Sequence, residues 1–179
     1  MEKLLRRKVD KYLMDWKNNP DRKPLIIKGA RQIGKTRSIE WFANQNYKCV
    51  VQINFVEQTK YKSIFDDGFE VDAIIKNISL LNPDIMFIPG STLFFFDELQ
   101  ACPNCATSLK FFKLDGRFDV ICSGSLMGIN YHRRHEKSRL FCILSVKKWI
   151  FSAFYCILMH TKLNGGRTWK IPKWYSPAT

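Results

Sequence analysis

The last quarter of the sequence lacks acidic residues altogether. Residues 137–179 contain eight Lys and Arg and no Asp or Glu, whereas residues 1–136 hold all 16 acidic residues beside 21 basic ones. The segment 137–179 therefore supplies +8 of the formal net charge of +13. A basic stretch without carboxylates is suited to bind nucleic acid or an anionic surface. The alternative is an unusual segment that has no such role.

Features typical of secreted and membrane proteins are also missing. The first eight residues, Met-Glu-Lys-Leu-Leu-Arg-Arg-Lys, have no apolar core of the kind found in a secretory leader. The apolar run at residues 149–159 is 11 residues long, and a membrane helix needs about 20, so we expect no membrane span. The six cysteines are scattered through the chain. We therefore expect reduced thiols and a cytoplasmic protein.

One Cys-x-x-Cys pair, Cys102-Pro-Asn-Cys105, has no second pair at zinc-site spacing. A turn at the entry to a helix is favoured here over zinc or redox chemistry. We find no internal repeat and no low-complexity stretch, so the sequence favours neither a repeat array nor a disordered chain.

The composition is that of a globular protein, with 46% hydrophobic and 25% charged residues, and 179 residues allow one domain or one domain with a fragment. Continuous apolar runs predict strands, and apolar residues at three- and four-residue spacing predict helices between them. The expected strands are 25–28, 49–55, 92–96 and 118–123, and the expected helices are 3–18, 35–46, 71–81 and about 106–112. This alternation predicts an α/β fold of three layers, with a central parallel sheet covered on both faces.

A glycine-bearing motif lies between the first strand and the second helix. It reads Gly29-Ala30-Arg31-Gln32-Ile33-Gly34-Lys35-Thr36, which fits the P-loop pattern G-x-x-x-x-G-K-[ST]. Glycines let the backbone approach phosphate, lysine supplies a cation for the β- and γ-phosphates, and the threonine hydroxyl is a ligand for Mg²⁺. We expect the nucleotide to be bound by Gly29, Ala30, Arg31, Gln32, Ile33, Gly34, Lys35, Thr36 and Arg37. Whether Arg31 touches nucleotide or faces solvent stays open.

Two acids follow the third strand, at Asp97 and Glu98. The carboxyl end of a parallel strand borders the ligand crevice of an α/β sheet. We expect Thr36 to bind Mg²⁺, Asp97 to hold the ion through a water molecule, and Glu98 to polarise the water that attacks the γ-phosphate. The glutamate favours hydrolysis over phosphoryl transfer to another substrate.

The fourth strand ends in Cys122-Ser123-Gly124-Ser125. A polar side chain there is placed to bind the γ-phosphate or the attacking water. We favour Ser123 for this catalytic role, with Ser125 as the other candidate. The alternative is that Gly-Ser only forms the turn after the strand.

Several motifs together resemble one group of prokaryotic AAA+ ATPases, in which an ATPase core is followed by a C-terminal domain of unknown function. They occur in the expected order, from the first helix to about Tyr131: the P-loop, Phe95-Phe96-Asp97-Glu98-Leu99-Gln100, Cys102-Pro103, Ser108-Leu109-Lys110-Phe111-Phe112 and Ser123-Gly124-Ser125-Leu126. The resemblance implies binding and hydrolysis of Mg-ATP. It also implies a sheet of five parallel strands with the P-loop strand near its middle.

The resemblance ends after Tyr131, where members of the group continue toward an apolar-Asp-Phe-Glu-Glu-Phe-Leu segment and several hundred further residues. We therefore expect an ATP-binding core at residues 1–132 and an atypical basic tail at 133–179. A frameshifted or truncated gene is our hypothesis for the tail. Trp149-Ile150 must be encoded TGG-ATN, and the adjacent frame reads an Asp codon there, with Met or Val before it and Phe allowed after it. Nucleotide sequence with an intact downstream family frame would support this hypothesis.

The sequence thus predicts an AAA+-type P-loop ATPase core. AAA+ enzymes often complete the site with an arginine, for which Arg133, Arg134 and Arg139 are available and none is assigned. One alternative is a nucleotide-binding module with little turnover, because elements beyond the core would be missing. Another is an ATPase associated with nucleic acid. Self-association is a further expectation.

Overall fold

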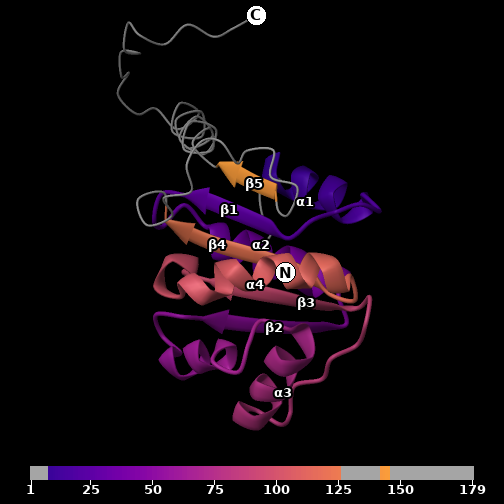
Figure 1. Ribbon diagram of the computed structural model, residues 1–179. Helices are drawn as coiled ribbons and strands as arrows, with labels where there is room; N and C mark the ends of the chain where they lie inside the picture. Colours follow the sequence, from indigo (N-terminus) through magenta and orange to yellow (C-terminus); the bar gives the residue numbers. More distant parts are fainter. Residues whose placement is uncertain (1–7, 126–141, 146–179) are drawn as a thin grey trace, which may run out of the picture. The chain divides into compact units, whose positions relative to one another are not determined.

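The computed structural model describes residues 8–125 and 142–145, all within one compact unit that spans residues 1–147. Its centre is a parallel sheet of five strands in the order β2-β3-β4-β1-β5 (Figure 1). The strands are β1 (Leu25–Gly29), β2 (Cys49–Asn54), β3 (Thr92–Asp97), β4 (Asp119–Ser125) and β5 (Cys142–Ser145). The predicted three-layer α/β fold is confirmed.

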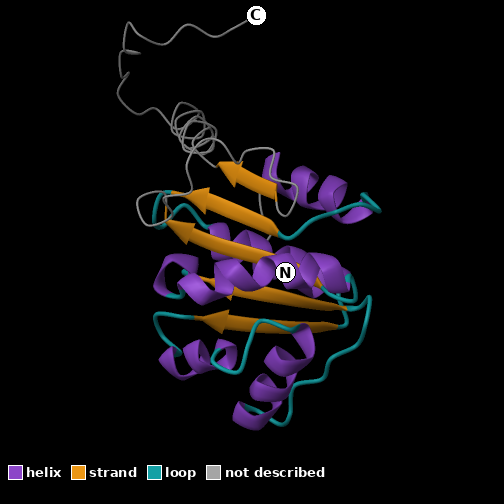
Figure 2. Ribbon diagram, viewed as in Figure 1, coloured by secondary structure: helices purple, strands orange, loops and turns teal. Residues whose placement is uncertain are grey.

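Helices connect the successive strands from β1 to β4 and cover the sheet (Figure 2). They are α1 (Lys8–Asn18), α2 (Lys35–Asn46), α3 (Val71–Leu81) and α4 (Pro103–Asp115), with 3-10 helices η1 (Thr59–Phe65) and η2 (Leu99–Ala101). In Figure 1, α4 lies in front of the strands and α2 behind them. The bounds of α2 and α3 agree with the predicted helices, and neither 3-10 helix was predicted.

The two faces of the sheet contact different helices, because successive side chains of a strand point to opposite faces. Phe94 and Phe96 of β3 belong to a buried cluster that includes residues of α3 and α4. Phe94 packs against the rings of Phe87, Phe96, Phe112 and Phe118, with centroids 5.1–5.8 Å apart. The intervening residues of β3, among them Asp97, therefore face the side of α2. This alternation places the last residue of β3 on the face that carries the P-loop helix.

Strand β5 extends the sheet beyond the expected core. It pairs in parallel with β1, with Leu25 opposite Cys142. The P-loop strand β1 therefore lies between the central strand β4 and the edge strand β5, and the expected sheet of five parallel strands is confirmed. Residues 142–145 belong to the segment that we assigned to the tail, because the resemblance to the family ends after Tyr131 and no acidic residue follows position 136. Where the core ends stays a prediction.

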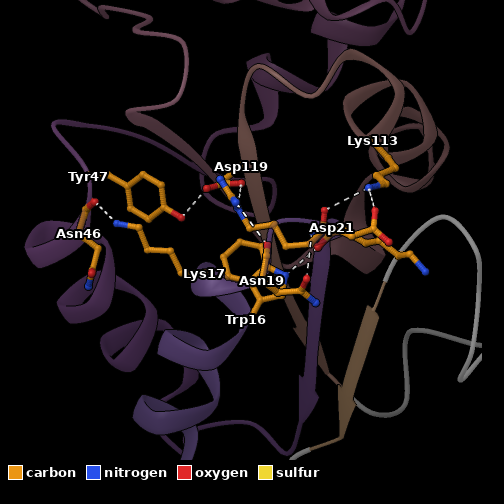
Figure 3. A network of polar contacts seen from close by, with 10 residues as sticks. Trp16, Lys17, Asn19, Asp21, Asn46, Tyr47, Lys113 and Asp119 are labelled. Atoms are coloured by element: carbon orange, nitrogen blue, oxygen red, sulfur yellow. Dashed lines mark hydrogen bonds and ion pairs between the residues drawn. The ribbon is translucent and has the colours of Figure 1, made fainter.

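A network of polar contacts closes the amino-terminal end of the sheet (Figure 3). Arg22 Nε donates to Asp119 Oδ1 at 2.6 Å, and the hydroxyl of Tyr47 donates to Asp119 Oδ2 at 2.8 Å. Asp119 begins β4, Arg22 precedes β1 and Tyr47 follows α2, so one carboxylate joins three segments. Burial raises the pKa of Tyr47 well above its ordinary value, and the negative charge of Asp119 adds to this shift.

We expect Asp119→Ala to lower the free energy of unfolding by about 2–3 kcal/mol, because it leaves a guanidinium and a buried phenol without their shared acceptor. Denaturant unfolding would measure the change. Asp21→Ala is the matched control, since it removes the partner of Lys113 from a carboxylate side chain that is 81% exposed. An equal effect of the two substitutions would contradict the importance of the Asp119 network.

The raised pKa of Tyr47 also predicts a dependence on pH. Folding favours the neutral phenol, so the stability linked to Tyr47 is fully present below about pH 10 and is lost as the pH rises further. The difference in unfolding free energy between wild type and Tyr47→Phe should therefore shrink between about pH 8 and about pH 11. A difference that stays constant over this range would show that folding does not shift this pKa.

Candidate functional site

The loop of the P-loop motif begins at the last residue of β1 and ends at the first turn of α2. Gly34 adopts a left-handed conformation with φ of 78° immediately before α2, and Gln32 has φ of 61°. Positive φ at two positions separated by one residue curves the backbone in the manner of the amide nests that bind anions. The glycine at position 34 avoids the steric cost that a Cβ would have there. The N-terminus of α2 therefore meets a curved loop, an arrangement suited to phosphate.

Lys35 is folded back onto this loop. Its Nζ donates to the carbonyl oxygens of Gly29, at 3.1 Å, and Ala30, at 2.7 Å. Burial lowers the pKa of Lys35, while the negative charges of Glu98 and Asp97 act in the opposite direction. The ammonium is thus held at the loop and feels both carboxylates.

Three polar side chains from three elements meet at Asp97. The hydroxyl of Thr36 donates to Asp97 Oδ2 at 2.9 Å, and the hydroxyl of Ser123 donates to Asp97 Oδ1. Asp97 is 6% exposed and Ser123 is fully buried. Helix α2, β3 and β4 are therefore joined at one carboxylate.

The pair of Thr36 and Asp97 fits the requirements of Mg²⁺. This ion prefers oxygen ligands, and it commonly takes one or two of them from the protein and others from phosphate and water. The contact of 2.9 Å already brings a hydroxyl and a carboxylate oxygen together. In the part of the chain that the structure describes, no group of three or more His, Cys, Asp or Glu residues could hold a metal ion by itself.

Glu98 has an unusual backbone conformation, with φ of 55° and ψ of 48°. A non-glycine residue in this left-handed region is strained and needs support from its surroundings. Its N–H donates to Asp97 Oδ1 at 2.9 Å, and its carbonyl accepts the N–H of Ala101 at 2.8 Å. The amide of Gln100 donates to the Glu98 carboxylate. These contacts hold the predicted catalytic glutamate in a defined place.

The other predicted residues lie at different depths. Arg31, Gln32 and Arg37 are exposed on the loop and the first turn of α2, whereas Ala30 and Ile33 are half-buried. Ser125 enters the site through its backbone, because its N–H donates to Gln100 Oε1 at 3.3 Å. The three arginines considered for the completion of the site, Arg133, Arg134 and Arg139, lie outside the described residues.

Sequence reasoning did not predict a role for Gln100. The residue appeared only as part of the family motif, and nothing in its spacing indicates that its amide contacts both Glu98 and the end of β4. The Cys-x-x-Cys pair behaves as predicted, because Cys102 directly precedes α4 and Pro103 is the first residue of that helix. Cys49, Cys102, Cys105 and Cys122 are free, and burial raises the pKa of both Cys102 and Cys105.

The fold places the chain in the class of P-loop NTPases with an α/β sandwich. The chain belongs to the AAA domain family, because the model of that family matches residues 21–139, more than half of the sequence. The resemblance to AAA+ ATPases is therefore confirmed for the core. At the level of the family, this membership assigns the chain to nucleotide-binding, ATPase-type domains.

Solved structures with a similar fold share little sequence with this chain. A DNA replication initiation factor is 13% identical, with a TM-score of 0.50 over 87% of this chain and 49% of the other. AMPPCP-bound DnaA from Aquifex aeolicus is also 13% identical, with a TM-score of 0.50 over 91% and 52%. PCH-2 from C. elegans is 14% identical, with a TM-score of 0.46 over 88% and 47%.

These likenesses concern the fold alone. The chain spans about half the length of the solved structures it matches. No curated protein matches the sequence. Among the described residues, no helix combines the length and the apolar character needed to cross a membrane.

We expect Ser123→Ala to lower the free energy of unfolding by about 1.5–3 kcal/mol, because the hydroxyl is a buried donor to a carboxylate. Ser125→Ala should have a much smaller effect, since its N–H, which alanine keeps, makes the contact with Gln100. Denaturant unfolding of both variants would compare the two serines. Equal stabilities would mean that the Ser123 hydroxyl does not support Asp97.

Proposed function

We propose that this chain binds Mg-ATP and hydrolyses it to ADP and phosphate. The observation that carries the proposal is the hydrogen bond of 2.9 Å between Thr36 and Asp97. This hydrogen bond brings the first turn of α2 into contact with the carboxylate at the end of β3. Lys35 directly precedes Thr36 in the sequence, and Glu98 directly follows Asp97. Membership of the AAA domain family supports the same class of substrate.

The loop and the start of α2 would bind the phosphates. Backbone N–H groups at the N-terminus of α2 and the dipole of that helix favour negative charge. Lys35 would exchange its bonds to the carbonyls of Gly29 and Ala30 for phosphate oxygens, which restores a charged partner to a partly buried ammonium. Thr36 and Asp97 would hold Mg²⁺, which neutralises phosphate charge when it is bound.

Glu98 is the proposed general base. The oxygen of a water molecule forms a bond to the γ-phosphorus, and the bond between that phosphorus and the bridging β–γ oxygen breaks. Glu98 accepts the proton that the water loses, and ADP leaves with the electron pair of the broken bond. The carboxylate of Glu98 is suited to this step because it follows β3 directly and is held by Gln100.

Ser123 is proposed to act through Asp97. Its hydroxyl donates to that carboxylate, so its direct effect is to orient the oxygens that would face Mg²⁺. A contact of Ser123 with the γ-phosphate or the attacking water, which the sequence predicted, would require the hydroxyl to turn away from Asp97.

The test compares Lys35→Ala and Glu98→Gln with wild type, by titration with ATP and by phosphate release. Lys35→Ala should weaken ATP binding at least about tenfold, because a charged donor to phosphate is lost. Glu98→Gln should bind ATP normally and lose about 10²- to 10⁴-fold in turnover, since the general base is lost. The exposed residues Lys60 and Glu57 provide matched controls, Lys60→Ala and Glu57→Gln, which should resemble wild type.

The outcomes separate the alternatives. Wild type that binds ATP and releases no phosphate would be a nucleotide-binding module with little turnover. Wild type that binds no ATP would contradict the proposal altogether. A Glu98→Gln variant with unchanged turnover would remove Glu98 from the mechanism.

Further proposals rest on the sequence alone. The acid-free segment 137–179 favours binding of nucleic acid, which would weaken steeply as salt is raised and would stimulate phosphate release. Self-association and a cytoplasmic location also stay predictions.

A further inference from the structure

Gln100 contacts both the proposed general base and the end of β4. It is the central residue of η2, the short 3-10 helix that follows Glu98. Leu99, beside it, is buried in the cluster formed with α3 and α4. The helix is therefore anchored in the core on one side, and Gln100 is half-buried at the site.

The amide of Gln100 makes two contacts of opposite kind. Its Nε2 donates to Glu98 Oε2, and its Oε1 accepts the backbone N–H of Ser125 at 3.3 Å. The two contacts require a donor and an acceptor at the ends of one planar group, which a primary amide supplies. Both contacts together fix the orientation of the amide.

These contacts connect Glu98 to the P-loop strand. Ser125 is the last residue of β4, and its partner in the sheet is Gly29, the first residue of the P-loop motif. A chain of contacts therefore runs from Glu98 through Gln100 and Ser125 to the strand position where the loop begins. Glu98 itself follows β3, which is not adjacent to β1 in the sheet.

The contact with Gln100 leaves Glu98 able to act as a base. A carboxylate has two oxygens with about four lone-pair sites, and one donor uses one of them. The hydrogen bond instead restricts rotation of a side chain whose backbone is already in a strained conformation. A catalytic group must be held close to its productive geometry, and a displacement of about 1 Å can reduce the rate about 100-fold.

We propose that Gln100 is a positioning residue that fixes the Glu98 carboxylate relative to the P-loop. The inference rests on the proposed hydrolysis of ATP, and it assigns to Gln100 an effect on the chemical step and not on nucleotide affinity. The residue acts through Glu98, so it is not itself catalytic.

The experiment measures single-turnover phosphate release and ATP affinity for wild type, Gln100→Met and Gln100→Glu. Methionine keeps the length of the side chain and removes both hydrogen bonds. Glutamate keeps the shape, removes the donor and places a second negative charge beside Glu98. Both variants should lose about 10- to 100-fold in the single-turnover rate, with ATP affinity within about twofold of wild type.

The matched control is Gln52→Met. Gln52 is exposed on β2, and its Nε2 donates to Glu40 Oε1 at 2.7 Å, so the same kind of amide–carboxylate pair is broken elsewhere. This variant should release phosphate at the wild-type rate. Circular dichroism and thermal unfolding would establish that all variants are folded. If Gln100→Met does not fold, the single-turnover rate of Gln100→Glu tests the proposal.

The possible failures are distinguishable. Active wild type together with active, folded Gln100 variants would overturn the role of Gln100 and leave the proposed hydrolysis intact. Loss of ATP affinity in parallel with loss of rate would also overturn it, because the effect would then concern the loop as a whole. Inactive wild type would overturn the proposed hydrolysis, and the role of Gln100 with it.

Discussion

The site depends on the buried carboxylate of Asp97. Removing a carboxylate from water is costly unless donors replace the lost water, and here the donors are two hydroxyls and one backbone N–H. Each donor comes from a different part of the chain: Thr36 from α2, Ser123 from β4 and Glu98 from the residue after β3. The requirement to satisfy one carboxylate therefore holds the phosphate-binding helix against the ends of two neighbouring strands.

Strand β3 makes this arrangement possible because one of its faces packs into the aromatic core and the other faces α2. Phe94 and Phe96 pack into the aromatic core on the side of α3 and α4, and their burial determines which face of β3 points toward that core. The alternation of side chains then directs Asp97 to the opposite face, where α2 begins. Shifting the register of the strand by one residue would turn the carboxylate of Asp97 toward the aromatic core and would turn Phe94 and Phe96 toward α2. The hydrophobic pattern of β3 thus determines the position of the site.

The sequence predicted the parts of the fold and site that depend on local patterns. The apolar runs, the helical spacing around α2 and α3, and the P-loop motif are all visible within a few neighbouring residues. The hydrogen bonds from Arg22 and Tyr47 to Asp119 cannot be predicted from neighbouring residues. The partners are 97 and 72 residues away in the sequence and meet only after the sheet has formed. Gln100 lies two residues from Glu98, yet its second contact is with Ser125 in another strand. The sequence did not predict strand β5, because a strand of four residues shows too little periodicity to indicate pairing with β1.

Two carboxylates at opposite ends of the sheet show how the choice of partners separates stability from chemistry. Asp119, at the start of β4, accepts from the cationic guanidinium of Arg22, so its charge is already balanced. The hydrogen bonds described for Asp97 come from neutral donors, and the ammonium of Lys35 acts on it through charge alone. A divalent cation that binds beside Thr36 would therefore meet a carboxylate whose hydrogen-bond donors carry no net charge. The same residue type thus serves as a structural tie at the amino-terminal end and as a candidate metal ligand at the carboxyl end.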